Sequence, residues 1–239
     1  MLDYSTLLLS IFFSLLISIT ISIDSLGLIM KSSSRGGQIA SAAVGANILS
    51  YISRASVILL LPLLGLIIDE KITIFYNIIL ISLLVLNSIF SFLILKLYDR
   101  LSFISQQSID QIKNGVIPFI QSYLKINKVK IHLNSLVKIK PLIALIIIYS
   151  VQFSIFPLLI ALSQIYPEFK TTIVSLYGAI TGCFTLYFVL IIDRRFAIKI
   201  DKLNGEAQGY CKSILLTKFY TINFILPFIY FLLYHLYYT

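Results

Sequence analysis

Residues that commonly carry chemistry are scarce in this 239-residue chain. It has no tryptophan, two cysteines, two histidines and ten acidic residues, and charged residues make up 12% of the sequence. The two cysteines, Cys183 and Cys211, are far apart, as are His132 and His235. Neither a disulfide framework nor a metal-binding motif is predicted from this spacing. We accordingly expect no cofactor.

The low charge content also limits the solvent in which such a chain is stable. An ordinary soluble domain has about 25% charged residues, whereas here 59% of the residues are hydrophobic. Such a chain cannot cover itself with polar surface, so the sequence predicts an integral membrane protein. The net charge of +9 could indicate nucleic acid, but most basic residues lie between apolar runs. They indicate membrane topology and contacts with anionic phospholipids, and no nucleic-acid partner is expected.

Six apolar runs are long enough to cross a bilayer as helices, which takes about 20 residues. They lie at about 4–23, 39–68, 72–95, 141–163, 171–192 and 214–237. We therefore predict an all-α integral membrane protein in which residues 1–239 form a single polytopic domain, a bundle of six transmembrane helices. The first run follows Asp3 with no Lys or Arg before it, so we expect it to remain as a helix and not to be a cleaved signal.

The basic residues predict the orientation of this bundle. If all six runs span the membrane, fifteen Lys and Arg lie on one side and only Lys71 and Lys170 on the other. The positive-inside rule then places both termini outside, an N-out/C-out topology. Segment 96–140, on the cytoplasmic side, carries eight basic residues. Its apolar residues have helical spacing, which predicts an amphipathic helix in the headgroup interface, with a solvated basic loop as the alternative: Leu101, Ile104, Ile109, Ile112, Val116, Ile120 and Tyr123.

Arg54 lies near the middle of the second run, where an ionisable side chain costs at least a few kcal/mol of insertion free energy. Asn47, Ser50, Tyr51 and Arg54 follow one another at helical spacing and therefore share one side of the helix. Two interpretations of Arg54 remain open. The guanidinium can pair with Asp24 or with main-chain carbonyls, or it can bind the phosphate of a substrate, for which its forked N–H donors are suited.

Carboxylates are absent from all six predicted runs. Proton-coupled carriers usually place Asp or Glu within their spans, and metal-dependent lipid transferases need clustered acidic residues to hold the cation. No pairing of a nucleophile with a base is visible either. The sequence therefore does not support an enzyme.

Small residues and prolines predict how some of the runs pack. Close approach of membrane helices favours small side chains, and two patterns of this kind predict packing surfaces: the stripe Ser10, Ser14, Ser18 and Ser22, and the GxxxG motif Gly178–Gly182. Prolines within three runs predict kinks: Pro62, Pro157 and Pro227.

The second run also resembles a known family. Residues Ile39-Ala-Ser-Ala-Ala-Val-Gly-Ala-Asn-Ile-Leu49, then Ser53-Arg54, Pro62-Leu-Leu-Gly65 and Asp69, look like the N-terminal signature of the Amj-type lipid II flippases. These proteins are the alternative to the MurJ flippases in some bacteria. The resemblance implies a flippase, not an enzyme, which moves an undecaprenyl-pyrophosphate-linked cell-envelope precursor, lipid II above all, across the bacterial cytoplasmic (inner) membrane. The residues that match are Asn47, Ser53, Arg54, Pro62, Gly65 and Asp69.

In this interpretation the headgroup of the polyprenyl-pyrophosphate-linked saccharide enters a polar cavity lined by the second run, while its tail stays in lipid. Arg54 neutralises part of the pyrophosphate charge, and its neighbours supply hydrogen bonds: Asn47, Ser50 and Tyr51. Arg194 and Arg195 gather the headgroup at the cytoplasmic side, or else serve only as a positive-inside anchor. The alternatives are an insertase-like assembly factor with a hydrophilic groove, a membrane enzyme acting on phospholipid or polyprenyl phosphate, and a transporter of another anionic substrate.

Overall fold

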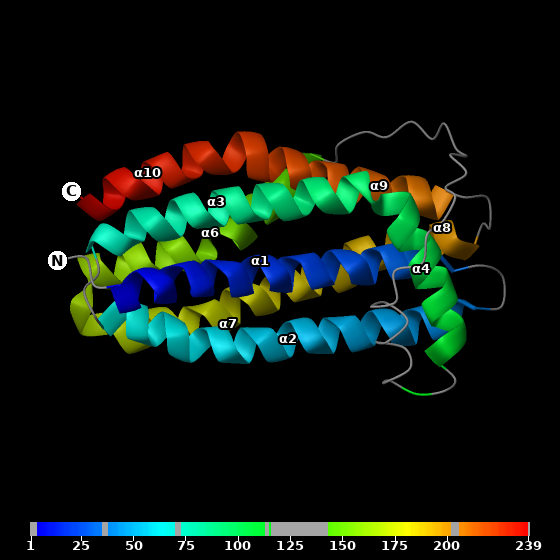
Figure 1. The fold of residues 1–239 in the computed structure, drawn as a ribbon, viewed down its shortest axis with the longest axis horizontal. Helices are drawn as coiled ribbons and strands as arrows, with labels where there is room; N and C mark the ends of the chain where they lie inside the picture. The colour runs from blue at the N-terminus through cyan, green and yellow to red at the C-terminus, as the bar shows by residue number, and fades with distance from the viewer. Residues whose placement is uncertain are drawn as a thin grey trace.

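The computed structural model describes residues 4–34, 38–69, 73–112, 115, 143–201 and 206–238. Their regular structure is helical, and the chain runs back and forth along one long bundle (Figure 1). Three long helices come first: α1 (Tyr4–Ser32), α2 (Ile39–Asp69) and α3 (Thr73–Lys96). The shorter helix α4 (Tyr98–Gln111) and then α6 (Ile143–Ile165) follow.

The remaining elements form two long, nearly continuous helical segments. The 3₁₀ turn η2 (Pro167–Phe169) leads into α7 (Lys170–Tyr187), which continues through the π-helical segment η3 (Phe188–Asp193) into α8 (Arg194–Asp201). The second of these consists of α9 (Glu206–Tyr220), the π-helical segment η4 (Thr221–Ile225) and α10 (Leu226–Tyr238). The start of α1 and the end of α10 lie at one end of the bundle, and α4 and α8 lie at the other (Figure 1).

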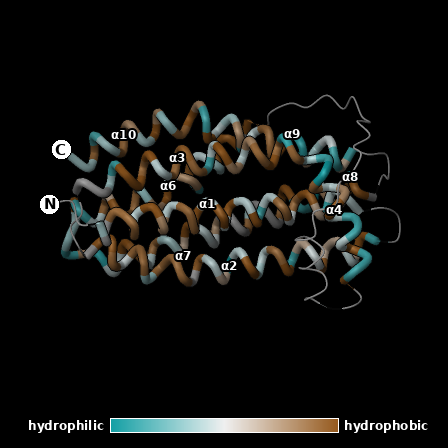
Figure 2. Tube along the Cα trace, in the orientation of Figure 1, coloured by the Kyte–Doolittle hydropathy of each residue, from teal (hydrophilic) through white to brown (hydrophobic). Residues whose placement is uncertain are grey.

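Five stretches of helix are long and apolar enough to cross a membrane: Leu7–Ser32, Ile39–Ile68, Tyr76–Lys96, Leu145–Ile165 and Glu206–Tyr238. The all-α prediction is therefore confirmed for the described residues. The predicted run at 171–192 falls on α7 and η3, which are not among the five. Hydrophobic residues extend along the bundle and hydrophilic ones gather at its ends (Figure 2). Large apolar side chains such as Leu59, Ile81 and Ile147 are exposed on the bundle surface, as expected of helices that face lipid.

The helix α1 extends well beyond residue 23, where the first apolar run ends, and takes in Asp24. The expectation that no carboxylate lies within a membrane-length helix is therefore wrong. A run that stops at its first charge ends too early here, because the sequence after Asp24 is again apolar through Met30. The last long segment likewise begins at Glu206 and not near residue 214.

One of the two predicted packing surfaces is present. Ser10, Ser14 and Ser18 are fully buried, and Ser14 accepts a 2.7 Å hydrogen bond from the hydroxyl of Ser82 on α3. A Cβ added at Gly178 or Gly182 would meet no atom within 4 Å, and both glycines are exposed. Within this chain the predicted close packing at the GxxxG motif is therefore wrong, because no described helix approaches either glycine closely.

The helix α4 lies across the end of the bundle opposite the termini (Figure 1). Its apolar residues Ile104 and Ile109 are buried, and Ile109 packs with Met30 of α1 and Ala42 of α2. The Tyr98 hydroxyl lies 3.1 Å from that of Ser32, and burial raises the pKa of the Tyr98 phenol. The rest of the predicted amphipathic and basic segment, including Val116, Ile120, Tyr123 and 125–140, lies outside the described residues.

Candidate functional site: a charged cluster between α1, α2 and α9

The polar side of α2 that the sequence predicts is accessible in the structure. Arg54 is the middle residue of this 31-residue helix; Asn47, Tyr51 and Arg54 are exposed, and Ser50 is half-buried. The Arg54 guanidinium lies 5.9 Å from the centre of the Tyr51 ring, a cation–π distance between residues one helical turn apart. The cation at the centre of α2 can therefore be reached by a ligand.

Asp24 of α1 is an acidic side chain within electrostatic range of Arg54. Its carboxylate interacts electrostatically with Arg54 and with Lys218, and the Ser53 hydroxyl is its hydrogen-bond partner. Ser53 also lies 3.4 Å from the main-chain oxygen of Thr20, which is one turn before Asp24 on the same side of α1. Asp24 is therefore near Arg54, but the ion pairs found among the described residues do not include this pair, and both interpretations of Arg54 stay open. Asp24 and Arg54 are both exposed, so Asp24 does not shield the guanidinium from a ligand.

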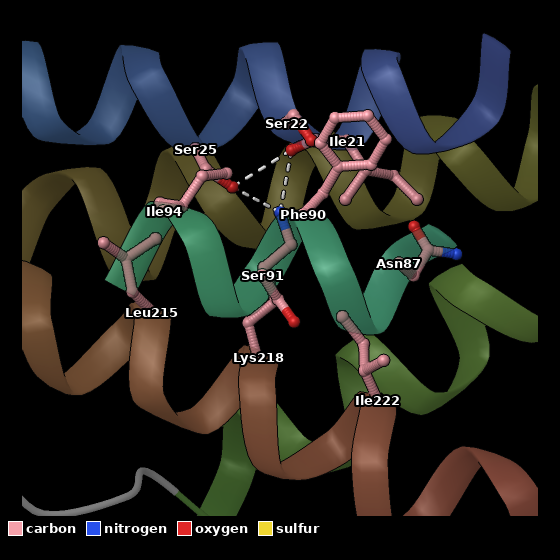
Figure 3. A pocket seen from close by; sticks show the side chains of 10 residues that line it. All are labelled: Ile21, Ser22, Ser25, Asn87, Phe90, Ser91, Ile94, Leu215, Lys218 and Ile222. Carbon is pink, nitrogen blue, oxygen red and sulfur yellow. Dashed lines mark hydrogen bonds between the residues drawn. The ribbon is translucent and has the colours of Figure 1, made fainter. Parts of the chain in front are cut away.

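Lys218 of α9 is a third member of this cluster. The sequence analysis did not predict it as a site residue, because it lies within an apolar run. Its ammonium donates hydrogen bonds to the main-chain oxygen of Ile21 at 2.8 Å and to the hydroxyl of Ser25, which ties α9 to α1 (Figure 3). The side chain is 7% exposed. The available signal was a lone lysine within the run 214–237, where a buried cation costs a few kcal/mol unless it finds partners.

The space around the Lys218 ammonium is small. A cavity of about 10 Å³ lies between α1, α3 and α9 and is lined in part by Ser22, Ser25, Asn87, Ser91 and Lys218 (Figure 3). Asn87 is 2% exposed, and its side-chain oxygen has no hydrogen-bond partner among the described residues. Such a volume holds about one water molecule. A large ligand therefore cannot bind on the Lys218 side of the cluster, and the accessible side is that of Arg54.

A larger hollow of about 580 Å³ lies between α2 and α7. Gly65 and Gly178 line it from opposite helices, and the missing side chains leave room at both positions. Its other walls are mainly apolar, and the Lys170 ammonium at its rim donates to the main-chain oxygen of Ile68 at 3.3 Å. The volume lies within the range of small-molecule sites. It adjoins the half of α2 between Arg54 and Asp69.

Arg194 and Arg195 are exposed at the start of α8. The residue before them, Asp193, forms a 2.9 Å ion pair with Lys31 near the end of α1. Along α1, Lys31 lies about 10 Å beyond Asp24, at 1.5 Å per residue. The structure therefore places the two arginines at the end of the bundle and does not bring them together with Arg54.

These features define an all-helical protein, compatible with a multi-pass membrane protein, whose charged cluster lies between helices of membrane length. No known protein family, curated protein or solved structure matches the chain.

Proposed function

We propose that this protein is a flippase for undecaprenyl-pyrophosphate-linked cell-envelope precursors, with lipid II as the first candidate. The observation that carries the proposal is the exposed guanidinium of Arg54 at the centre of a membrane-length helix, with Asn47 and Tyr51 exposed on the same side. A charged side chain at that depth requires polar interaction partners or a polar cavity. The pyrophosphate of a lipid-linked sugar supplies oxygen acceptors that match the guanidinium donors. The resemblance of residues 39–69 to the Amj-type flippases supports the same substrate class.

In this proposal α7 and η3 form a sixth span of the bacterial cytoplasmic (inner) membrane. An even number of crossings agrees with the start of α1 and the end of α10 lying at one end of the bundle (Figure 1). The opposite end carries Lys31, Lys212, Arg194 and Arg195 and is the cytoplasmic one by the positive-inside rule. Basic residues at that end contact anionic phospholipids.

The headgroup moves along the exposed side of α2 while the polyprenyl tail remains in the bilayer. Arg194 and Arg195 hold it first at the cytoplasmic end, and Arg54 then compensates the pyrophosphate charge at mid-membrane. The hollow between α2 and α7 offers an apolar surface beside the second half of this path. No bond forms or breaks in this process, so the protein is proposed as a transporter and not as an enzyme. The membrane potential favours outward movement of an anion by about 2.3 kcal/mol per charge per 100 mV.

The decisive experiment is complementation of a bacterium depleted of its usual lipid II flippases, with surface exposure of lipid II measured directly. Expression of this chain should restore growth and exposure. Protein that is inserted and abundant but restores neither would refute the proposal for lipid II. Photocrosslinking from position 51 then identifies the occupant of the α2 surface, because a nascent polypeptide in place of a lipid-linked sugar would indicate an insertase-like factor.

A further inference from the structure

Asp24, Arg54 and Lys218 come from three different helices, each within a stretch of membrane length, and interact electrostatically. At the usual charges of these residue types, they are two cations and one carboxylate. We call these three residues the mid-bundle cluster. Its excess of one positive charge cannot be neutralised by Asp24 alone, and an unpaired charge at membrane depth is costly. The cluster is therefore built to accept one more anion.

The two cations differ in what else they contact. The Lys218 ammonium is buried and already donates to Ile21 and Ser25, neutral groups of α1. The Arg54 guanidinium is exposed and has the Tyr51 ring beside it. An incoming anion can thus reach Arg54, whereas the cavity at Lys218 has room for about one water molecule.

Asp24 is placed to serve either cation. Its neighbour in sequence, Ser25, accepts a hydrogen bond from Lys218, and Thr20, one turn earlier on the same side of α1, faces Ser53 next to Arg54. An anion bound to Arg54 repels the Asp24 carboxylate and weakens the attraction between Asp24 and Arg54. The carboxylate is then drawn toward Lys218, the other basic residue with which it interacts electrostatically.

We propose that Asp24 is a counter-ion shared by Arg54 and Lys218, and that the phosphate headgroup of a lipid binds Arg54 by displacing Asp24 toward Lys218. The second half of this inference rests on the proposed function, whereas the first half does not. Headgroup binding on α2 is thereby linked to α9, the helix that leads into the π-helical segment η4.

Sharing of the counter-ion is tested without any ligand by double-mutant cycles on thermal unfolding of the full chain in detergent. Asp24→Asn is combined with Arg54→Met in one cycle and with Lys218→Met in the other. We expect the shifts in melting temperature to be non-additive in both cycles. Removing either cation should cost less stability once Asp24 has been replaced by a neutral residue. Additive shifts in melting temperature in either cycle overturn the sharing. If Lys218→Met does not fold alone, folding restored by adding Asp24→Asn counts as coupling, and continued failure counts against it.

Displacement is tested by binding of undecaprenyl pyrophosphate to the protein in phosphatidylcholine nanodiscs. Asp24→Asn should tighten binding about fivefold, the lower end of coupling between linked sites, and Lys218→Met should weaken it by a similar factor. In the Asp24→Asn background, Lys218→Met should have no further effect, whereas a simple loss of positive charge would weaken binding again. Unchanged or weaker binding by Asp24→Asn, or a persisting Lys218→Met effect, overturns the displacement. Wild-type protein that binds no undecaprenyl pyrophosphate overturns both the displacement and the proposed function, while the cycles still decide the sharing.

Discussion

The hydroxyl of Tyr230 on α10 donates a 2.9 Å hydrogen bond to the main-chain oxygen of Phe153 on α6. In a regular helix this oxygen would accept from the N–H of residue 157, but Pro157 has none. Tyr230 is 2% exposed, so the bond lies in the core. A proline within a membrane-length helix is thus accommodated by a side chain from another helix, which is how such prolines are tolerated in lipid.

Tyr230→Phe should therefore lower the free energy of unfolding by about 1–3 kcal/mol, because it leaves the buried Phe153 oxygen without a partner. Denaturation in mixed micelles measures this change. Tyr234→Phe on the same helix is the matched control, since Tyr234 is 38% exposed. Equal effects of the two substitutions would show that the bond to Phe153 contributes nothing specific.

Gly182→Ala should leave the fold intact and raise stability by about 0.5–1 kcal/mol. A Cβ at this position meets no atom within 4 Å, and alanine has the higher helix propensity. Gly115→Ala should act in the opposite direction, because Gly115 has a φ of 109° that L residues rarely adopt. Melting temperatures of the two variants provide the comparison. A destabilised Gly182→Ala variant would reveal that α7 packs against something, such as a second copy of the chain.

The pair formed by Lys212 and Asp99 should contribute little. Its atoms are 2.9 Å apart, but both side chains are partly exposed, and such pairs are worth at most about 1 kcal/mol. Asp99→Asn should therefore cost no more than that, and less at high salt. Lys212→Ala should cost more, since the ammonium also lies 4.7 Å from the centre of the Tyr98 ring. Unfolding at low and high salt tests both statements, and a salt-independent loss for Asp99→Asn would contradict the first.

Run length and hydrophobicity were enough to predict most of the helices, because the thickness of a bilayer imposes a narrow range of lengths. The run 39–68 coincides with the candidate span Ile39–Ile68. The bounds of the first and last runs were predicted less well. Helix α1 continues beyond Asp24, and α9 begins before Lys212, whereas each predicted run ended at or near that charged residue. Lys218 is tolerated because it donates hydrogen bonds to Ile21 and Ser25 of α1, and it interacts electrostatically with Asp24 of the same helix. Asp24 and Lys218 are separated by most of the sequence, so no local sequence pattern could predict that they lie near each other.

The candidate site shows a similar division. Helical spacing placed Asn47, Tyr51 and Arg54 on one side of α2, because spacing depends only on local geometry. Whether that side would be exposed could not be predicted from spacing, because exposure depends on how the helices pack. The GxxxG motif was a poor guide to that packing, since no described helix approaches Gly178 or Gly182 closely. Lys218 could not be assigned to the site before α9 was seen to lie against α1.

Arg54→Ala should abolish translocation of the lipid-linked precursor while leaving the protein inserted and abundant. The side chain is exposed, so its loss removes a ligand contact without opening the core. Arg54→Lys should also lose most of the activity, because an ammonium keeps the charge but lacks the planar fork that binds two phosphate oxygens. Accessibility of the lipid-linked precursor at the outer surface measures both variants, with Arg100→Ala on α4 as the control for loss of one positive charge elsewhere. Full activity of Arg54→Ala would refute the substrate role, and full activity of Arg54→Lys alone would show that charge is sufficient.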